Sequence, residues 1–204
     1  MGTRMRWFVA LLALGAMAGA CDDATTVEDG LTTGEAEELA SAMADEAFAV
    51  SGDVAVASDD AGAEIRPLVV VTTTFEVTRT CPGGGDVTLA GERVREWDRE
   101  TRNGTMDMTM TKTHNACVRT PREHAVTLDG DPNVEVVVHR AREGGDWSGE
   151  QTMSMDGAFT WSTDDGRSGT CVVDIDAVYD PETQTRTVTG TFCDRTIERT
   201  TTWS

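Results

Sequence analysis

Four cysteines in the body of the chain could form disulfides, and their spacing indicates the pairs. Cys171 and Cys193 lie equally far from residue 182, the centre of a predicted turn, and Cys81 and Cys117 are centred on residue 99 in the same way. A hairpin folded at each turn would bring the two cysteines of a pair together. We therefore predict disulfides between Cys81 and Cys117 and between Cys171 and Cys193.

Other side chains that carry chemistry show no arrangement that predicts a reaction. The three histidines, His114, His124 and His139, form no helical H-x-x-x-H pair, and the chain has no C-x-x-C pair. We therefore predict neither a metal site nor a cofactor. The sequence also lacks a G-x-S-x-G nucleophile motif. No catalytic residue is assigned, and the chain is not expected to be an enzyme.

The N-terminal stretch has the pattern of an export signal. Arg4 and Arg6 precede an uncharged run at residues 7–20, which is shorter than the ~20 residues that a membrane-spanning helix needs. We predict a signal peptide at residues 1–20. Its end, Ala18-Gly19-Ala20-Cys21, resembles the lipobox of bacterial lipoproteins. The resemblance implies lipidation of Cys21, and a protein anchored by lipid on the exported side of the bacterial cell envelope, in the periplasm or at the cell surface.

Cleavage by ordinary signal peptidase is the alternative at this site. Ala18 and Ala20 also fit its small-x-small rule, and the lipobox more commonly has leucine where this chain has Ala18. That cleavage would release a soluble secreted protein. The number of cysteines favours lipidation, because setting Cys21 aside leaves an even set that can pair in an oxidising compartment. The body of the chain carries no motif of a known family.

Composition limits the partners that the protein can have. The chain has 17 basic and 36 acidic residues and a net charge of -19. Because contacts with phosphate dominate nucleic-acid affinity, a strongly acidic chain is not expected to bind nucleic acid. Cationic partners are compatible with this charge. Solubility through self-repulsion is the favoured explanation of the charge.

Three N-terminal segments precede the main domain. Residues 21–33 are polar and acidic and are predicted to form a tether, and residues 51–66 are predicted to form a linker. Between them, apolar residues recur at helical spacing, and Glu35 follows Thr32 at the spacing of a capping box. We predict one short amphipathic helix at residues 34–50.

From residue 67 to residue 204 the hydrophobic pattern has period two. Val134, Val136 and Val138, for example, alternate with the polar residues Glu135 and His139, and short turns separate the segments. Such turns leave no room for crossover helices, so we predict an all-β domain, an antiparallel meander of nine or ten strands. We expect a curled sheet or an up-and-down barrel with one apolar face, and a second face rich in Thr, Asp, Glu and Arg. A turn is predicted at Asp156 and Gly157.

The apolar face gives two hypotheses of function. Its residues could fill a core or line a pocket for an apolar ligand; they include Met106, Met108, Met110, Met153, Met155, Phe159 and Trp161. A filled core favours a non-catalytic binding or structural module of the envelope. A pocket would favour a carrier of an apolar small molecule or lipid, similar to lipocalins in architecture alone. Neither hypothesis identifies the protein partner or the ligand.

Overall fold

The computed structural model describes residues 30–56, 68–130 and 133–202, with side chains omitted at 53–56, 147 and 148. The predicted signal peptide, Cys21 and most of the predicted tether lie outside these ranges. So do residues 57–66 of the predicted linker.

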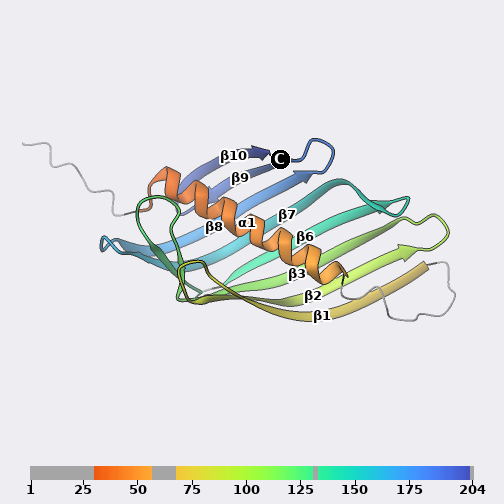
Figure 1. Ribbon diagram of the computed structural model, residues 1–204, viewed down its shortest axis with the longest axis horizontal. Coiled ribbons are helices and arrows are strands. Elements are labelled where there is room, and N and C mark those ends of the chain that lie inside the picture. Colours follow the sequence, from red (N-terminus) through yellow and green to blue (C-terminus); the bar gives the residue numbers. More distant parts are fainter. Residues whose placement is uncertain (1–29, 57–67, 131–132, 203–204) are drawn as a thin grey trace, which may run out of the picture.

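The described chain forms one helix followed by one antiparallel sheet (Figure 1). Eight strands pair in the order β1-β2-β3-β6-β7-β8-β9-β10, while the short strands β4 and β5 form a flap that joins the sheet through β7. The elements are α1 (Thr33–Val56), β1 (Leu68–Thr80), β2 (Asp86–Asp98), β3 (Gly104–Asn115), β4 (Cys117–Arg119), β5 (Val126–Asp129), β6 (Val134–Glu143), β7 (Asp146–Thr163), β8 (Ser168–Asp180), β9 (Thr185–Phe192) and β10 (Arg195–Thr202).

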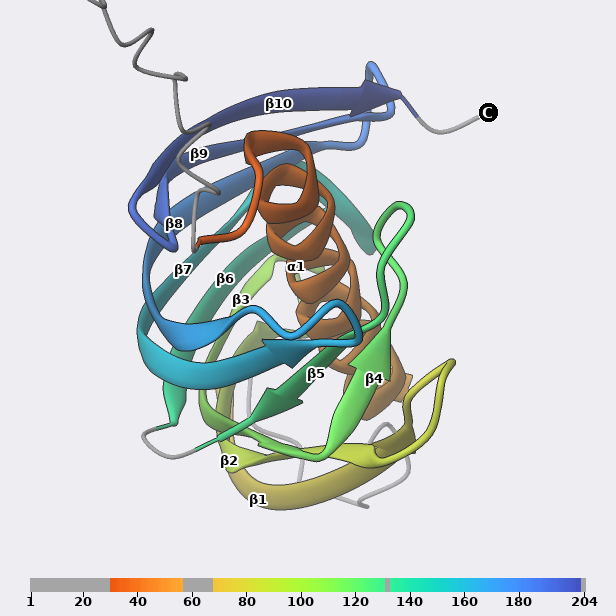
Figure 2. The ribbon, with the colours of Figure 1, turned by 90° about the vertical axis from the view of Figure 1, so that its left-hand side faces the viewer.

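The predicted fold class is confirmed, with the curled sheet as the correct form. The sheet curls around α1, which lies in its concave side (Figure 2). Among the described strands β1 and β10 are the two ends of the order and do not pair with each other. The up-and-down barrel was therefore the wrong alternative. A helix fills the space that a closed barrel would have enclosed.

The helix begins with the predicted capping box. The backbone N–H of Thr32 donates to Oε2 of Glu35 (2.8 Å), and the N–H of Glu35 donates to the Thr32 hydroxyl (3.3 Å). These two bonds satisfy amide groups that have no partner within the helix. The helix continues to Val56, beyond the predicted end at residue 50, so residues 51–56 are helical and not part of a linker.

Glycines at inward-facing positions allow neighbouring strands to approach closely where the sheet curls. A Cβ added to Gly91 would lie 2.1 Å from the carbonyl oxygen of Thr109, and one added to Gly190 would lie 2.2 Å from that of Asp174. Gly157 lies in the same way within β7, which runs unbroken through it. The predicted turn at Asp156 and Gly157 is therefore wrong, because this glycine serves close strand packing.

The predicted disulfides close the open ends of two hairpins. The bridge between Cys81 and Cys117 joins the turn before β2 to strand β4 after β3. The bridge between Cys171 and Cys193 joins β8 to the turn between β9 and β10. Both pairings agree with the prediction from spacing.

Candidate functional site

The residues predicted to fill a core or line a pocket lie between the sheet and α1. Met106, Met108, Met110, Met153 and Met155 are at most 2% exposed, and they share one core with the apolar face of the helix. Phe159 is fully buried and its ring packs against those of His114 and Phe192. Trp161 is 5% exposed. All seven residues therefore belong to the core that the sheet shares with the helix.

Charged residues of the long strands are divided completely between the two faces of the sheet. Strand register and burial show that every described Lys or Arg of these eight strands faces the concave side. These residues are Arg79, Arg93, Arg95, Lys112, Arg140, Arg142, Arg186, Arg195 and Arg199. The acidic residues of the same strands, such as Glu92, Glu135, Asp156 and Asp174, face the convex side.

This division corrects one sequence prediction. We expected Arg to share the solvent face with Thr, Asp and Glu, because charged residues normally lie outside. Instead, Arg93 and Arg95 occupy the same alternating positions as Val87 and Leu89, and Arg93 is only 2% exposed. Their alternation in step with Val87 and Leu89 along strand β2 was the signal that could have placed these arginines correctly.

Four of the concave arginines form a cluster with Trp97, which we call the arginine end. Register places Arg95 opposite Met106, and Met106 opposite Arg140, in one row across three strands. Arg93 lies in the next row toward the core, opposite Met108. The arginine end therefore consists of Arg93, Arg95, Arg140, Arg142 and Trp97, on β2 and β6 beside β3.

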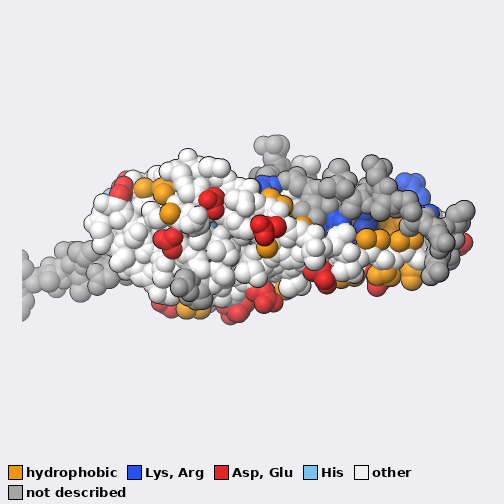
Figure 3. Space-filling view, turned by 90° about the horizontal axis from the view of Figure 1, so that it is seen from below, with side chains coloured by type: hydrophobic (Ala, Val, Ile, Leu, Met, Phe, Trp, Pro, Cys, Tyr) orange, Lys and Arg blue, Asp and Glu red, His pale blue; other side chains and the backbone are white. Residues whose placement is uncertain are grey.

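The indole of Trp97 helps to hold this cluster. The guanidinium carbon of Arg142 lies 4.5 Å from the ring centroid, and that of Arg95 lies 5.7 Å from it. Both distances are within the range of cation–π attraction. In Figure 3, Lys and Arg side chains gather beside apolar ones at one end of the molecule. The ring therefore stabilises two of the cations at fixed positions.

Burial and existing contacts define the electrostatics of this end. Burial lowers the pKa of Arg140, although an arginine remains charged at neutral pH. All four arginines already have a bonding partner in the structure. Each guanidinium carries five N–H donors in a planar arrangement. The chemistry of the cluster is that of carboxylate or phosphate recognition.

A second group of polar residues ties α1 to the sheet. Lys112 is fully buried, and its Nζ donates to Oε2 of Glu46 on the helix (2.7 Å). Arg119 of the flap donates to the same oxygen (2.9 Å). Burial and the neighbouring cations lower the pKa of His114 to about 3, so this histidine is neutral. The group joins three elements and is a structural ion-pair network.

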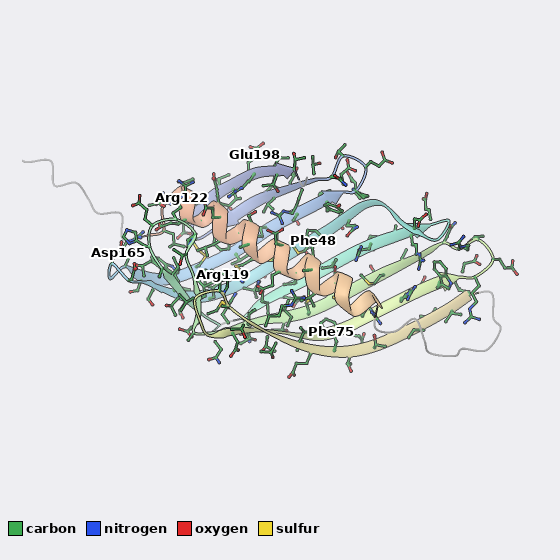
Figure 4. All side chains as sticks on the ribbon, viewed as in Figure 1. Phe48, Phe75, Arg119, Arg122, Asp165 and Glu198 are labelled. Carbon is green, nitrogen blue, oxygen red and sulfur yellow. A yellow bond between two sulfur atoms is a disulfide. The ribbon has the colours of Figure 1, made fainter. Side chains whose placement is uncertain are left out.

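A third group lies beside the flap, at the start of α1 (Figure 4). His124, Asp164 and Asp165 are the described residues that come close enough together to hold a metal ion. However, Nδ1 of His124 faces Asp164 (3.2 Å) while its Nε2 faces Asp165 (3.5 Å). Nε of Arg167 donates to both oxygens of Asp165. The hydrogen bond between His124 and Asp164 and the ion pair between Arg167 and Asp165 account for this geometry without a metal.

Arg167 also binds the helix. Its terminal nitrogens donate to the two carboxylate oxygens of Glu35 (2.9 and 3.0 Å). This pair lowers the pKa of Glu35 to about 2, chiefly through the hydrogen bond from Arg167. Glu35, Arg167 and Asp165 border a surface hollow of about 620 Å³. The hollow is lined by groups that already bind one another.

Comparisons with known proteins give no relative. No family model matches the chain, and neither a curated protein nor a solved structure matches it. Within the described ranges, no helix is long and apolar enough to cross a membrane. Arguments about function therefore rest on the residues and geometry of this chain.

Proposed function

We propose that this protein is a lipid-anchored module of the bacterial envelope, without a catalytic role, that binds an anionic group at the arginine end. The export signal and the lipobox resemblance at residues 18–21 support the anchor. Lipidation of Cys21 would hold the domain on the exported side of a membrane. The lack of a nucleophile motif supports a binding role.

The main support for an anionic ligand is the division of charged residues between the two faces of the sheet, with the basic residues on the concave face. Cations that face a protein interior are costly unless anions compensate them. Carboxylates of α1 compensate some of them: Glu46 binds Lys112, and Asp45 binds Arg186. At the arginine end the sheet places four guanidinium groups and an indole together, in a chain whose net charge is -19. An anion is the ligand that this concentration of positive charge would attract.

Our second proposal is that the protein carries an apolar molecule, and the buried methionines favour it. Met side chains adapt to irregular apolar ligands, and five of them lie under α1. To admit a ligand there, the helix would have to leave the sheet and break its ion pairs with Lys112 and Arg186. At the arginine end Arg95, Arg140 and Arg142 are partly exposed with the helix in place, so it is our first proposal.

Titration calorimetry with inorganic pyrophosphate tests the anion site. The native protein should bind the probe, and the double variant Arg95→Gln with Arg140→Gln should bind it at least about tenfold more weakly, because charged hydrogen bonds are lost. Arg102→Gln is the matched control, since Arg102 is an exposed arginine in the turn between β2 and β3. It should leave the affinity unchanged.

Two outcomes would reject the anion site. One is no binding by the native protein, which would make the cluster a structural ion-pair network. The other is an equal loss of affinity in Arg102→Gln, which would make the attraction nonspecific. Circular dichroism of each variant checks that its sheet is intact.

Mass spectrometry of protein purified from its own host tests the anchor and the carrier. A mature chain that begins at Cys21 and carries acyl groups would support lipidation, and a bare Cys21 would contradict it. A stoichiometric apolar molecule that stays bound under native conditions and leaves on unfolding would favour the carrier over the anion-binding module.

A further inference from the structure

Strand β1 leaves one of its two backbone edges without a partner among the described residues. It pairs with β2 along all thirteen residues, from Leu68 to Thr80, and it ends the strand order. Figure 1 shows β1 along the lower border of the sheet, and Figure 3 views the molecule from that side. A free strand edge presents a row of N–H and C=O groups to which another strand can add.

Natural proteins usually protect such an edge with charges, proline, bulges or a short strand. The opposite edge has that protection: β10 is eight residues long and includes Arg195, Glu198 and Arg199. In β1, residues 68–75 contain no charge, proline or glycine, and the pairing with β2 shows no bulge. Edge strand β1 is therefore the one suited to pairing.

The inner face of β1 is also incompletely covered. Its inward side chains, among them Val71, Phe75 and Val77, are only half-buried, whereas those of β3 and β6 near the core are buried. On the outer face Leu68 and Val70 are 57% and 55% exposed. One added strand would cover the inner residues and extend the same core.

The sequence of β1 is self-complementary, which favours a second copy of this chain as that strand. An antiparallel pair of β1 strands centred on Thr74 places Glu76 of one copy opposite Thr72 of the other. Arg79 then lies opposite Val69, and Val71 opposite Val77. No like charges meet directly, which matters for two copies with a net charge of -19 each. The inward apolar residues face one another.

We propose that two copies of this protein associate through their β1 edges, about a two-fold axis near Thr74, to form one continuous antiparallel sheet. A two-fold contact uses the same surface on both subunits and closes, so it leaves no further β1 edge for aggregation. The dimer does not depend on the proposed anionic ligand, because the arginine end lies on β2 and β6.

Cysteine cross-linking of the full chain in its host tests the pairing directly. Thr74→Cys should give a homodimer with a short bismaleimide, because the two residues 74 lie next to each other at the axis. Thr109→Cys on the interior strand β3 and Thr200→Cys on the other edge, β10, are exposed controls. Neither should cross-link.

Light scattering of the purified mature protein in mild detergent provides the second measurement. The native protein should have twice the protomer mass, and Thr72→Glu should halve it, because the new carboxylate would lie opposite Glu76 of the other copy on both sides of the axis. Thr200→Glu on β10 should leave the dimer intact.

Several results would overturn the proposal. They are a native protein that is monomeric at its highest soluble concentration, cross-linking at Thr109 or Thr200 as strong as at Thr74, and a dimer that survives Thr72→Glu. A native monomer that loses another protein partner on the β1 substitutions would show edge pairing with that partner, and would equally reject self-association.

Discussion

Lys112 is a charged side chain at the centre of an apolar core. It is fully buried, and burial lowers its pKa to about 8, against the opposing attraction of Glu46. The neighbouring core positions hold methionine and valine. A buried ion pair often contributes less to stability than well-packed apolar residues, while removal of one partner is costly.

Replacing each partner in turn should give unequal effects. Lys112→Met should leave the free energy of unfolding unchanged or raise it by about 1 kcal/mol, because Glu46 keeps Arg119 as its counter-charge. Glu46→Gln should lower it by about 3 kcal/mol, because it leaves the buried Lys112 without a carboxylate. Urea unfolding at pH 7 measures both. A larger loss in Lys112→Met than in Glu46→Gln would contradict this view of the pair.

The same lysine predicts how stability changes in alkaline solution. Its folded-state pKa of about 8 lies below its ordinary value of 10.5, so the unfolded chain binds more protons between these two pH values. Stability should therefore rise with pH across this window through the contribution of Lys112. The difference between the native protein and Lys112→Met, measured by urea unfolding at several pH values, isolates that contribution. A pH-independent difference would contradict it.

Glu35 predicts a change of stability with pH in acid solution. Its pKa falls from 4.5 to about 2 in the folded protein because Arg167 binds its carboxylate. The stability that this pair contributes is complete above pH 4.5 and is lost as the pH falls toward 2. The shift corresponds to about 3 kcal/mol. Glu35→Gln should be less stable than the native protein at pH 6, and the difference should vanish near pH 2; a constant difference would contradict this assignment.

At the scale of elements, the curl of the sheet depends on small residues at the inward positions. Gly91→Ala should lower the free energy of unfolding by about 1 to 3 kcal/mol, because the new methyl group would meet the backbone of β3. Gly52 in α1 is the matched control, since nothing lies within 4 Å of an added Cβ there. Gly52→Ala should be neutral or slightly stabilising. Equal effects in thermal unfolding would show that Gly91 does not limit the curl.

The helix and the strands could be predicted because the spacing of apolar residues, about 3.6 in a helix and two in a strand, can be seen in the local sequence. The capping residues Thr32 and Glu35 marked the start of α1 correctly. Its end was missed because the apolar helical pattern that we used stops at Ala47, although the backbone stays helical through Val56. Gly157 resembled a turn residue because local sequence does not distinguish a glycine at a turn from one under a neighbouring strand.

The candidate site was harder to predict than the fold. The disulfides followed from symmetric spacing about turns, which is local information. The arginine end did not, because hydrophobicity scales assign every arginine to solvent. Its position depends on which face of the sheet receives the acidic helix, as with Glu46 and Asp45 beside the concave cations. That choice belongs to the tertiary structure.

At the scale of the whole molecule, the division of charge brings acidic side chains close together on the convex face, where they repel one another. Glu135, Asp156 and Asp174 lie directly opposite one another across β6, β7 and β8. Like charges at opposite positions of neighbouring strands destabilise a sheet. With a net charge of -19, this repulsion acts over the whole surface and is reduced by salt.

Neutralising the middle carboxylate of that row should therefore stabilise the fold. Asp156→Asn is expected to raise the free energy of unfolding by about 0.5 to 1 kcal/mol at low ionic strength, because it removes two unfavourable neighbours at once. In 1 M salt the Debye length is about 3 Å, shorter than the separation of opposite side chains, so the gain should nearly disappear. Glu198→Gln is the control, since Glu198 lies on the same face opposite Thr189 and not opposite another acid (Figure 4). Urea unfolding at both salt concentrations measures the four values. A gain that persists in high salt, or an equal gain in Glu198→Gln, would contradict this explanation. Either result would mean that repulsion within this row of carboxylates does not lower the free energy of unfolding.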